Sequence, residues 1–282
     1  MGIQLSLQKN EVRNIVLAVI LCAGEGKRLS EIITDIPKPL IKINVLGNKA
    51  ILHHTIDLLH KLGVFRIIIV KGHLGKKIED FFELLIKENI KLKEKLFLID
   101  SLELYKLGPL YSFLSITKDK IVFQDKYKYL IIPGDTIFQY DLLNEILSIL
   151  DEKTKLMQTY PLIFYRKIRV KSLKQRTKSK SISIIDLKEI KSQKFLKRIN
   201  EVQLDSLSHH EFINQIIPIF LFTYQFIQEI IDMEKLVSVK TIKEIVNKLI
   251  MKGSKILAIK IDDDYNFFDI DTSQDLIEIE KL

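Results

Sequence analysis

The sequence predicts an α/β fold with a parallel sheet, and three consecutive segments carry this prediction. Residues 15–22 are a short run of β-branched and other apolar residues, which is typical of a strand buried on both faces. Residues 48–62 place apolar side chains at helical spacing and stop at Gly63. Residues 65–70 are a second apolar strand. A strand, a helix and a strand in this order form a βαβ unit, which joins parallel strands by a right-handed crossover.

The rest of the chain continues the alternation of strands and helices. A helix is expected to begin within residues 72–82, because Ile78, Phe81 and Phe82 share one face of it. Apolar runs predict further strands at residues 96–99, 128–133, 156–165 and 255–261. Periodic apolar positions predict further helices at residues 107–117, 141–150, 223–231, 240–251 and 274–281.

Composition favours a compact protein with anionic partners. The chain has 282 residues, 47% of them hydrophobic, which is ample for a buried core. The chain has no stretch of 18 uninterrupted apolar residues, so no membrane span is predicted. Residues 1–13 are too polar for a signal peptide, and we therefore expect a cytoplasmic protein. With one cysteine, Cys22, and six scattered histidines, neither an intrachain disulfide nor a Cys/His zinc site is predicted. The formal net charge of +8 suits nucleotides, sugar phosphates, nucleic acid or acidic lipid alike.

A glycine-rich loop follows the first predicted strand and is the main candidate for a binding site. Gly24 and Gly26 allow backbone amides to approach a polyphosphate, and Lys27, Arg28 and Lys38 bring positive charge to the same place.

Two familiar glycine loops do not fit this segment. A P-loop requires glycine where the chain has Leu21, and serine or threonine where it has Arg28. A dinucleotide-binding fingerprint requires a third glycine, and Leu29 occupies that position, which disfavours a dinucleotide-dependent oxidoreductase.

Two short motifs together resemble the signature of the sugar-phosphate nucleotidyltransferases, also called nucleotide-sugar pyrophosphorylases. The first is Ala23-Gly24-x-Gly26-x-Arg28-Leu29, and the second is the Pro-Lys-Pro-Leu run at residues 37–40. Residues 70–82 and 267–276 also resemble segments of this family. The resemblance implies a Rossmann-like, mixed and mostly parallel sheet flanked by helices in three α/β/α layers, the nucleotide-diphospho-sugar transferase type of the GT-A-like superfamily.

The same resemblance implies roles for individual residues. It implies Arg28 and Lys38 as catalytic residues, and Asp135 and Asp269 as ligands of Mg²⁺. It implies Gly108 as a nucleotide-binding residue, for which a structural turn at the start of a helix is an equal alternative. Asp271, Thr272 or Ser273 could instead simply cap the last helix, whereas Asp269 comes too early for that. The nucleotide-binding residues implied are Leu21, Ala23, Gly24, Gly26, Lys27 and Gly108.

The second half of the chain departs from the family pattern. We expect residues 1–282 to form a single nucleotidyltransferase domain, with the nucleotide-binding part at about residues 15–150 and the acceptor-binding part at about 151–282. The Glu-Lys-Pro motif of the family is missing here, since Glu201 is followed by Val202. Lys194 and Lys197 are the remaining candidates for the role of the motif's lysine. Asn214 and Asp271 are candidate acceptor-binding residues.

Residues 166–198 concentrate the positive charge of the chain. Thirteen lysines and arginines face only two acidic residues there, and Phe195 is the one aromatic residue. We expect a solvated excursion, with a β-ribbon as one form of it, beside the acceptor site. Docking of nucleic acid or an anionic membrane is the less favoured alternative, because single-strand binding usually needs interleaved aromatic side chains.

The resemblance implies a Mg²⁺-dependent nucleotidyltransferase that joins a nucleoside triphosphate to a sugar 1-phosphate and releases pyrophosphate. Transfer of a cytidylyl group to inositol phosphate or another alcohol phosphate is an alternative. An inert relative that binds RNA or a protein as a scaffold is an alternative of another class. The sequence leaves the base, the acceptor and the oligomeric state open.

Overall fold

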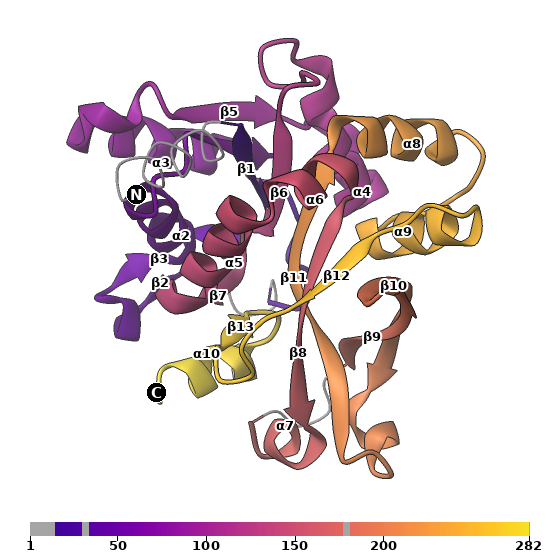
Figure 1. Ribbon diagram of the computed structural model, residues 1–282. Coiled ribbons are helices and arrows are strands. Elements are labelled where there is room, and N and C mark those ends of the chain that lie inside the picture. Colours follow the sequence, from indigo (N-terminus) through magenta and orange to yellow (C-terminus); the bar gives the residue numbers. More distant parts are fainter. Residues whose placement is uncertain (1–14, 30–33, 177–180, 282) are drawn as a thin grey trace, which may run out of the picture.

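The computed structural model describes residues 15–29, 34–176 and 181–281, which form three layers (Figure 1). The middle layer is a nine-stranded sheet with the order β5-β4-β1-β6-β11-β8-β12-β10-β9. Helices cover both of its faces. The predicted α/β fold with a mixed sheet is therefore confirmed.

The first strand, β1 (Val16–Cys22), lies in the parallel part of the sheet. It pairs in parallel with β4 (Arg66–Lys71) on one side and β6 (Lys128–Pro133) on the other, and β5 (Leu96–Asp100) extends this part beyond β4. Successive β1 side chains enter opposite cores, as expected of a strand buried on both faces.

The two helical layers enclose these two cores. One face of the sheet packs against α2 (Ile51–Lys61), α3 (Gly75–Glu88), α5 (Tyr140–Glu152) and α6 (Thr154–Thr159). The other face packs against α4 (Pro109–Leu114), α8 (Tyr224–Glu234) and α9 (Ile242–Met251).

The second half of the chain contributes the antiparallel part of the sheet. Strand β11 (Phe212–Thr223) runs antiparallel to both β6 and β8 (Leu162–Arg169), and β12 (Leu257–Lys260) runs parallel to β8. Strands β9 (Ser181–Ile190) and β10 (Gln193–Gln203) form an antiparallel ribbon at the edge. Gln215 of β11 pairs with Ile184 of β9, which joins this ribbon to the sheet.

Short elements carry the C-terminal segment back to the end of β6. Strand β13 (Phe267–Asp269) pairs with β7 (Thr136–Phe138), and α10 (Ser273–Ile279) follows it. A second small sheet joins β2 (Lys42–Ile43) to β3 (Lys49–Ala50). A separate apolar cluster that includes Leu29, Ile41, Ile137 and Ile270 holds these elements together. The C-terminal segment is thereby fixed beside the segments that follow β1 and β6.

The predicted strand at residues 156–165 is wrong in its first part. Residues up to Thr159 form α6, which buries Met157, and β8 starts only at Leu162. Tyr160, the residue before Pro161, is extended. A residue before proline is disfavoured in a helix, so the proline separates the two elements.

The solvated excursion expected at residues 166–198 is only partly correct. Residues 181–198 do belong to the antiparallel ribbon. However, Arg166 is buried at 3% exposure within β8, and α7 (Val170–Arg176) forms a helical turn before the ribbon. Lys178 and Lys180 lie outside the described residues. Within the described ranges, no helix combines the length and apolarity needed to cross a membrane.

Candidate active site

The glycine loop leaves β1 at the edge where the parallel strands end. The Ala23 carbonyl accepts a hydrogen bond from the His73 amide (3.1 Å), and the Gly26 carbonyl accepts one from the Leu29 amide (2.9 Å). Gly26 has a φ of +64°, a conformation that favours glycine, whereas a Cβ added at Gly24 would meet no atom within 4 Å. The loop is therefore held at both ends and open at Gly24.

The three predicted cations of the loop region have different surroundings. The Lys27 side chain is 82% exposed and its ammonium lies 2.7 Å from the Glu25 carboxylate, which raises the pKa of Lys27. Arg28 is also exposed, at 72% of its side chain. Lys38 begins the short 3₁₀ turn Lys38–Leu40 and is only 12% exposed. Lys38 is therefore the cation that the fold holds most firmly.

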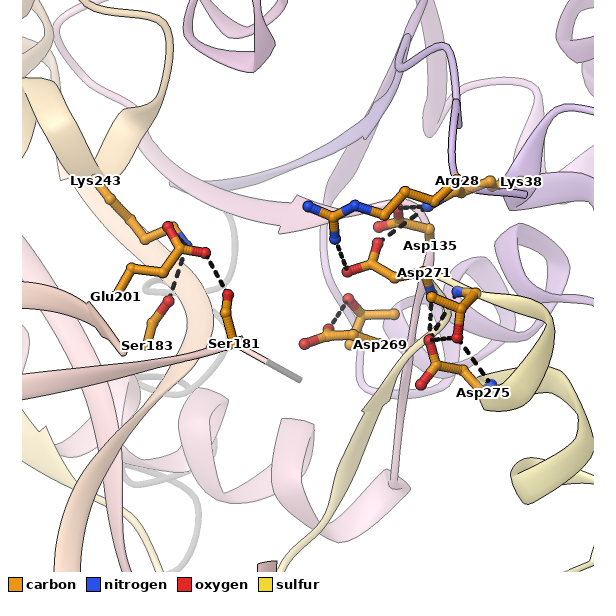
Figure 2. A network of polar contacts seen from close by, with 12 residues as sticks. Arg28, Lys38, Asp135, Ser181, Ser183, Glu201, Lys243, Asp269, Asp271 and Asp275 are labelled. Atoms are coloured by element: carbon orange, nitrogen blue, oxygen red, sulfur yellow. Dashed lines mark hydrogen bonds and ion pairs between the residues drawn. The ribbon is translucent and has the colours of Figure 1, made fainter. Parts of the chain in front are cut away.

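Asp135, Asp269 and Asp271 form a group that we call the carboxylate cluster (Figure 2). The Lys38 ammonium lies 3.0 Å from Asp271 Oδ1 and 3.7 Å from Asp135 Oδ2. Arg28 Nη1 lies 3.3 Å from Asp271 Oδ2. Residues far apart in the sequence thus meet beside the glycine loop.

The strand pairing of β13 with β7 positions Asp269. Asp269 lies opposite Thr136 in the register, and the Thr136 hydroxyl donates a 2.6 Å hydrogen bond to Asp269 Oδ1. Thr136 directly follows Asp135, so one short segment supplies one carboxylate and orients the other. Sequence reasoning missed Thr136, because its role depends on a pairing between distant strands.

The carboxylate cluster favours an added cation. Desolvation by the surrounding protein raises the pKa of Asp135 to about 6. The nearby Lys38 ammonium opposes this shift, whereas the Asp269 and Asp271 carboxylates add to it. A further positive charge would relieve this repulsion, and carboxylate oxygens suit hard divalent cations. Among the described residues, no three His, Cys, Asp or Glu side chains are arranged to hold a metal ion by themselves. A cation here would therefore also need ligands from substrate or water.

Close packing fixes the backbone immediately before Asp135. The Gly134 amide donates a 3.0 Å hydrogen bond to the Leu21 carbonyl. A Cβ at Gly134 would lie 2.7 Å from both Cys22 Sγ and the Leu21 carbonyl oxygen, so only glycine fits between the two strand ends. This requirement explains the glycine that directly precedes Asp135, and it depends on contacts that the sequence does not reveal.

Two predicted site residues lie outside the contacts of the carboxylate cluster. Gly108 has a φ of +124°, and a Cβ there would lie 2.6 Å from the Lys240 carbonyl oxygen, so the helix-start turn explains this glycine without a ligand. Asn214 lies on β11 opposite Lys167 of β8 and makes none of the cluster contacts described. Thr272, not Asp271, caps α10, with Asp275 completing the capping box.

Arg166 is a structural residue that sequence reasoning placed in the solvated stretch. Its Nε donates to Gln215 Oε1 and its Nη1 to Asn266 Oδ1, both at 3.0 Å, and Nη1 also donates to the Tyr265 carbonyl. Asn266 immediately precedes β13. Arg166 therefore connects β8 and β11 to the segment that carries Asp269.

Solved structures share this fold. A structure of UDP-glucose pyrophosphorylase in complex with UDP-glucose matches with a TM-score of 0.68 at 14% identity, over 95% of this chain and 97% of that one. The inositol-1-phosphate CTP transferase from T. maritima matches with a TM-score of 0.64 at 17% identity, over 95% and 96% of the two chains. These similarities confirm the nucleotide-diphospho-sugar transferase type of fold.

The sequence relatives described here match only part of this chain. A probable glucose-1-phosphate cytidylyltransferase of Bacillus subtilis (strain 168) is 46% identical over 65 residues, which are 23% of this chain and 24% of the relative. The D-glycero-alpha-D-manno-heptose 1-phosphate guanylyltransferase of Campylobacter jejuni is 33% identical over 125 residues, 44% of this chain and 50% of the relative. The chain thus spans at most half the length of these two curated relatives.

A family described as the MobA-like NTP transferase domain matches residues 18–181, which are more than half of the chain. The match includes the glycine loop, Lys38 and Asp135, and it ends before Asp269. The resemblance drawn from the two short motifs is confirmed at the level of the family. The chain belongs to the MobA-like NTP transferase domain family.

Proposed function

We propose that this protein transfers a nucleotidyl group from a nucleoside triphosphate to a phosphomonoester and releases pyrophosphate. One observation carries the proposal: the carboxylate cluster meets Lys38 and Arg28 beside an open glycine loop. Carboxylates, a largely buried ammonium and accessible loop amides together suit a metal-bound polyphosphate.

A sugar 1-phosphate is the acceptor we favour. The names of the relatives support it, since one is a probable glucose-1-phosphate cytidylyltransferase and another a heptose 1-phosphate guanylyltransferase. Their two names differ in the base, so the proposal specifies none. A polyol or alcohol phosphate is the second candidate, because the fold is shared with an inositol-1-phosphate CTP transferase and the chain lacks the Glu-Lys-Pro motif.

The residues of the loop would bind and orient the triphosphate. Gly24 and Gly26 would present backbone amides to its oxygens, with Leu21, Ala23 and Lys27 completing the nucleotide-binding segment. Arg28 would bind the β- and γ-phosphates that leave as pyrophosphate, and Lys38 would neutralise charge near the α-phosphate.

Asp135 and Asp269 would hold a divalent metal ion, for which we propose Mg²⁺. Their oxygen ligands and the excess of negative charge around Asp135 fit such an ion. Mg²⁺ commonly combines one or two protein carboxylates with phosphate oxygens and water, which fits a site with few protein ligands. When bound, the ion supplies charge neutralisation between nucleotide and acceptor phosphates.

The reaction needs positioning and positive charge more than covalent participation by the protein. An oxygen of the acceptor phosphate forms a bond to the α-phosphorus, and the bond from the α-phosphorus to the bridging oxygen breaks. The electron pair leaves with pyrophosphate. Because a phosphate monoester is already ionised near pH 7, no protein group has to remove a proton from it.

The proposal is tested by pyrophosphate release across the four common ribonucleoside triphosphates and dTTP, each paired with glucose 1-phosphate or inositol 1-phosphate and Mg²⁺. We expect one pair to give turnover, and Asp135→Ala to abolish it. Undiminished turnover in Asp135→Ala would reject the metal assignment. Salt-dependent RNA binding with no thermal shift from any triphosphate would instead favour a scaffold.

A further inference from the structure

Figure 2 shows a second polar group, across the view from the carboxylate cluster, that the roles above leave unexplained. Lys243 of α9 donates a 2.8 Å hydrogen bond from Nζ to Ser183 Oγ of β9, and lies 3.8 Å from Glu201 Oε2 of β10. Ser181 Oγ donates to Glu201 Oε1 at 2.9 Å. We call Ser181, Ser183, Glu201 and Lys243 the ribbon cluster.

Backbone contacts place Lys243 near the end of the sheet that carries the glycine loop. The carbonyl of Lys240, just before α9, accepts a 3.0 Å hydrogen bond from the Leu110 amide and packs against Gly108. The segment that includes Gly108 follows β5, a neighbour of β4 in the parallel sheet. The start of α9 is therefore anchored to a loop at the same end of the sheet as the glycine loop.

A second connection joins the ribbon to the segment that carries Asp269. Ile184, next to Ser183, pairs with Gln215, and the Gln215 side chain accepts from Arg166. Arg166 in turn donates to Asn266 ahead of β13. Figure 2 shows the result: Lys243 and Glu201 extend toward Arg28 and Asp271 from the opposite side of the view.

The ribbon cluster contributes little to folding by itself. The Lys243 and Glu201 side chains are 37% and 62% exposed, so their pairing at 3.8 Å contributes little to stability. Within the described part of the chain, the ammonium makes its short contact, at 2.8 Å, with the neutral Ser183 hydroxyl. The cluster thus presents a cation, a carboxylate and hydroxyls that a polar ligand can reach.

Other cations are less suitable for a second phosphate group. Lys38 and Arg28 both pair with Asp271 and are assigned to the triphosphate in the proposed function. The ribbon has Val202 after Glu201, and its exposed Lys194 lies beside the hairpin turn, opposite Glu189. Lys197, also exposed, is four residues from Glu201, about 13 Å along a strand.

We propose that Lys243 binds the phosphate group of the acceptor, and that Glu201 and Ser183 bind its hydroxyl groups. This inference rests on the proposed function, because it assigns the second substrate of that reaction. Helix α9, which contacts the ribbon through Lys243, would then supply the cation that the ribbon lacks next to Glu201. The acceptor phosphate would lie between Lys243 and the carboxylate cluster.

The first test is the steady-state kinetics of Lys243→Gln with the active substrate pair. Loss of one charged hydrogen bond should raise KM for the acceptor phosphate roughly 10- to 100-fold and leave KM for the triphosphate unchanged. Lys248→Gln is the matched control, because Lys248 is exposed on the same helix. An unchanged acceptor KM, or a raised triphosphate KM, would overturn the inference.

The second test separates the phosphate from the hydroxyl groups by calorimetry, which needs no turnover. Glucose 1-phosphate and inositol 1-phosphate are titrated into the protein with Mg²⁺, and glucose and inositol serve as their unphosphorylated counterparts. Lys243→Gln should weaken binding of the phosphate only, and Glu201→Gln should weaken both forms. Wild-type protein that binds neither phosphate, or a Lys243 variant that binds both as wild type does, would overturn the inference.

The failures of the two proposals are distinguishable. Absence of pyrophosphate release by the wild-type protein with every substrate pair contradicts the proposed function. Active wild-type protein together with an unchanged acceptor KM in Lys243→Gln contradicts only the role of Lys243.

Discussion

The two sides of the site are built in different ways. The proposed phosphate side, formed by the glycine loop, Lys38 and the carboxylate cluster, lies where buried parallel strands and a short strand pair end, and its charges contact one another. The proposed acceptor side, formed by the ribbon cluster, lies on the antiparallel ribbon at the edge of the sheet and the first turn of α9. The core fixes the first side, whereas a few surface side chains define the second.

This difference separates chemistry from specificity. Residues that act on the triphosphate need fixed positions, because misplacement by about 1 Å can cost about 100-fold in rate. Residues that select an acceptor can change on a ribbon without disturbing a core. We therefore expect substitutions on the phosphate side to lower kcat and those on the acceptor side to raise KM for one substrate.

After the loss of turnover expected for Asp135→Ala, the largest expected effect is on the phosphate side, at Asp269. Asp269→Asn keeps the shape of the side chain and the Thr136 contact but removes the charge, so kcat/KM should fall about 1,000-fold. Pyrophosphate release measures it. Asp232→Asn on α8, an exposed carboxylate far along the chain, should leave the rate unchanged. Equal rates for Asp269→Asn and the wild type would remove Asp269 from the site.

Lys38 should show the next largest effect. Lys38→Met removes the 12%-exposed ammonium between Asp271 and Asp135 and leaves two carboxylates facing the triphosphate, so kcat should fall about 100-fold. Lys42→Met, an exposed neighbour in β2, is the control. If both variants had the same kcat, Lys38 would have no specific role.

Two glycines sharpen the comparison between folding and binding. Gly134→Ala forces a Cβ to 2.7 Å from Cys22 Sγ and should lower the free energy of unfolding by about 2 kcal/mol. Gly24→Ala places its Cβ in open space and should change stability by less than about 0.5 kcal/mol, yet weaken triphosphate binding. Urea unfolding and nucleotide titration measure both effects. A large stability loss at Gly24 would mean that the fold, rather than a ligand, requires that glycine.

The smallest expected effect concerns the cap that holds α9 on the acceptor side. The Glu244 carboxylate accepts hydrogen bonds from the Lys240 and Thr241 amides, and these bonds lower its pKa. Because the folded-state pKa is the lower one, this stabilisation is present above the usual carboxyl pKa and lost as pH falls through the folded-state value. The carboxylate is exposed, so the contribution is less than about 1 kcal/mol.

Urea unfolding of Glu244→Gln and the wild type from pH 7 to pH 3 tests this prediction. The wild type should be slightly more stable at pH 7, and the difference should disappear at low pH. A constant difference over the whole range would contradict the role of the ionised carboxylate.

The phosphate side could be predicted from the sequence because its signals are local. The glycine loop and Lys38 lie close together in the chain, and Asp135 directly follows a recognisable strand. The end of a parallel strand is also where such a fold binds ligands. The order of these motifs was therefore enough to expect them in one place.

The acceptor side could not be predicted, because its contacts join distant segments. Lys243 is unremarkable within an amphipathic helix until α9 packs beside the ribbon. Arg166 looked like one cation among many, although it is buried and holds Asn266. Residues 156–159 have an apolar pattern that suits either a strand or a helix, and Pro161 decided where the strand could begin.

The most direct test of the account is a crystal of the protein with Mn²⁺ and a non-hydrolysable analogue of the best triphosphate, examined by anomalous scattering. The account predicts a metal peak bonded to Asp135 and Asp269, with the phosphates over Gly24 and Gly26. A peak elsewhere, or a triphosphate bound away from the glycine loop, would contradict it.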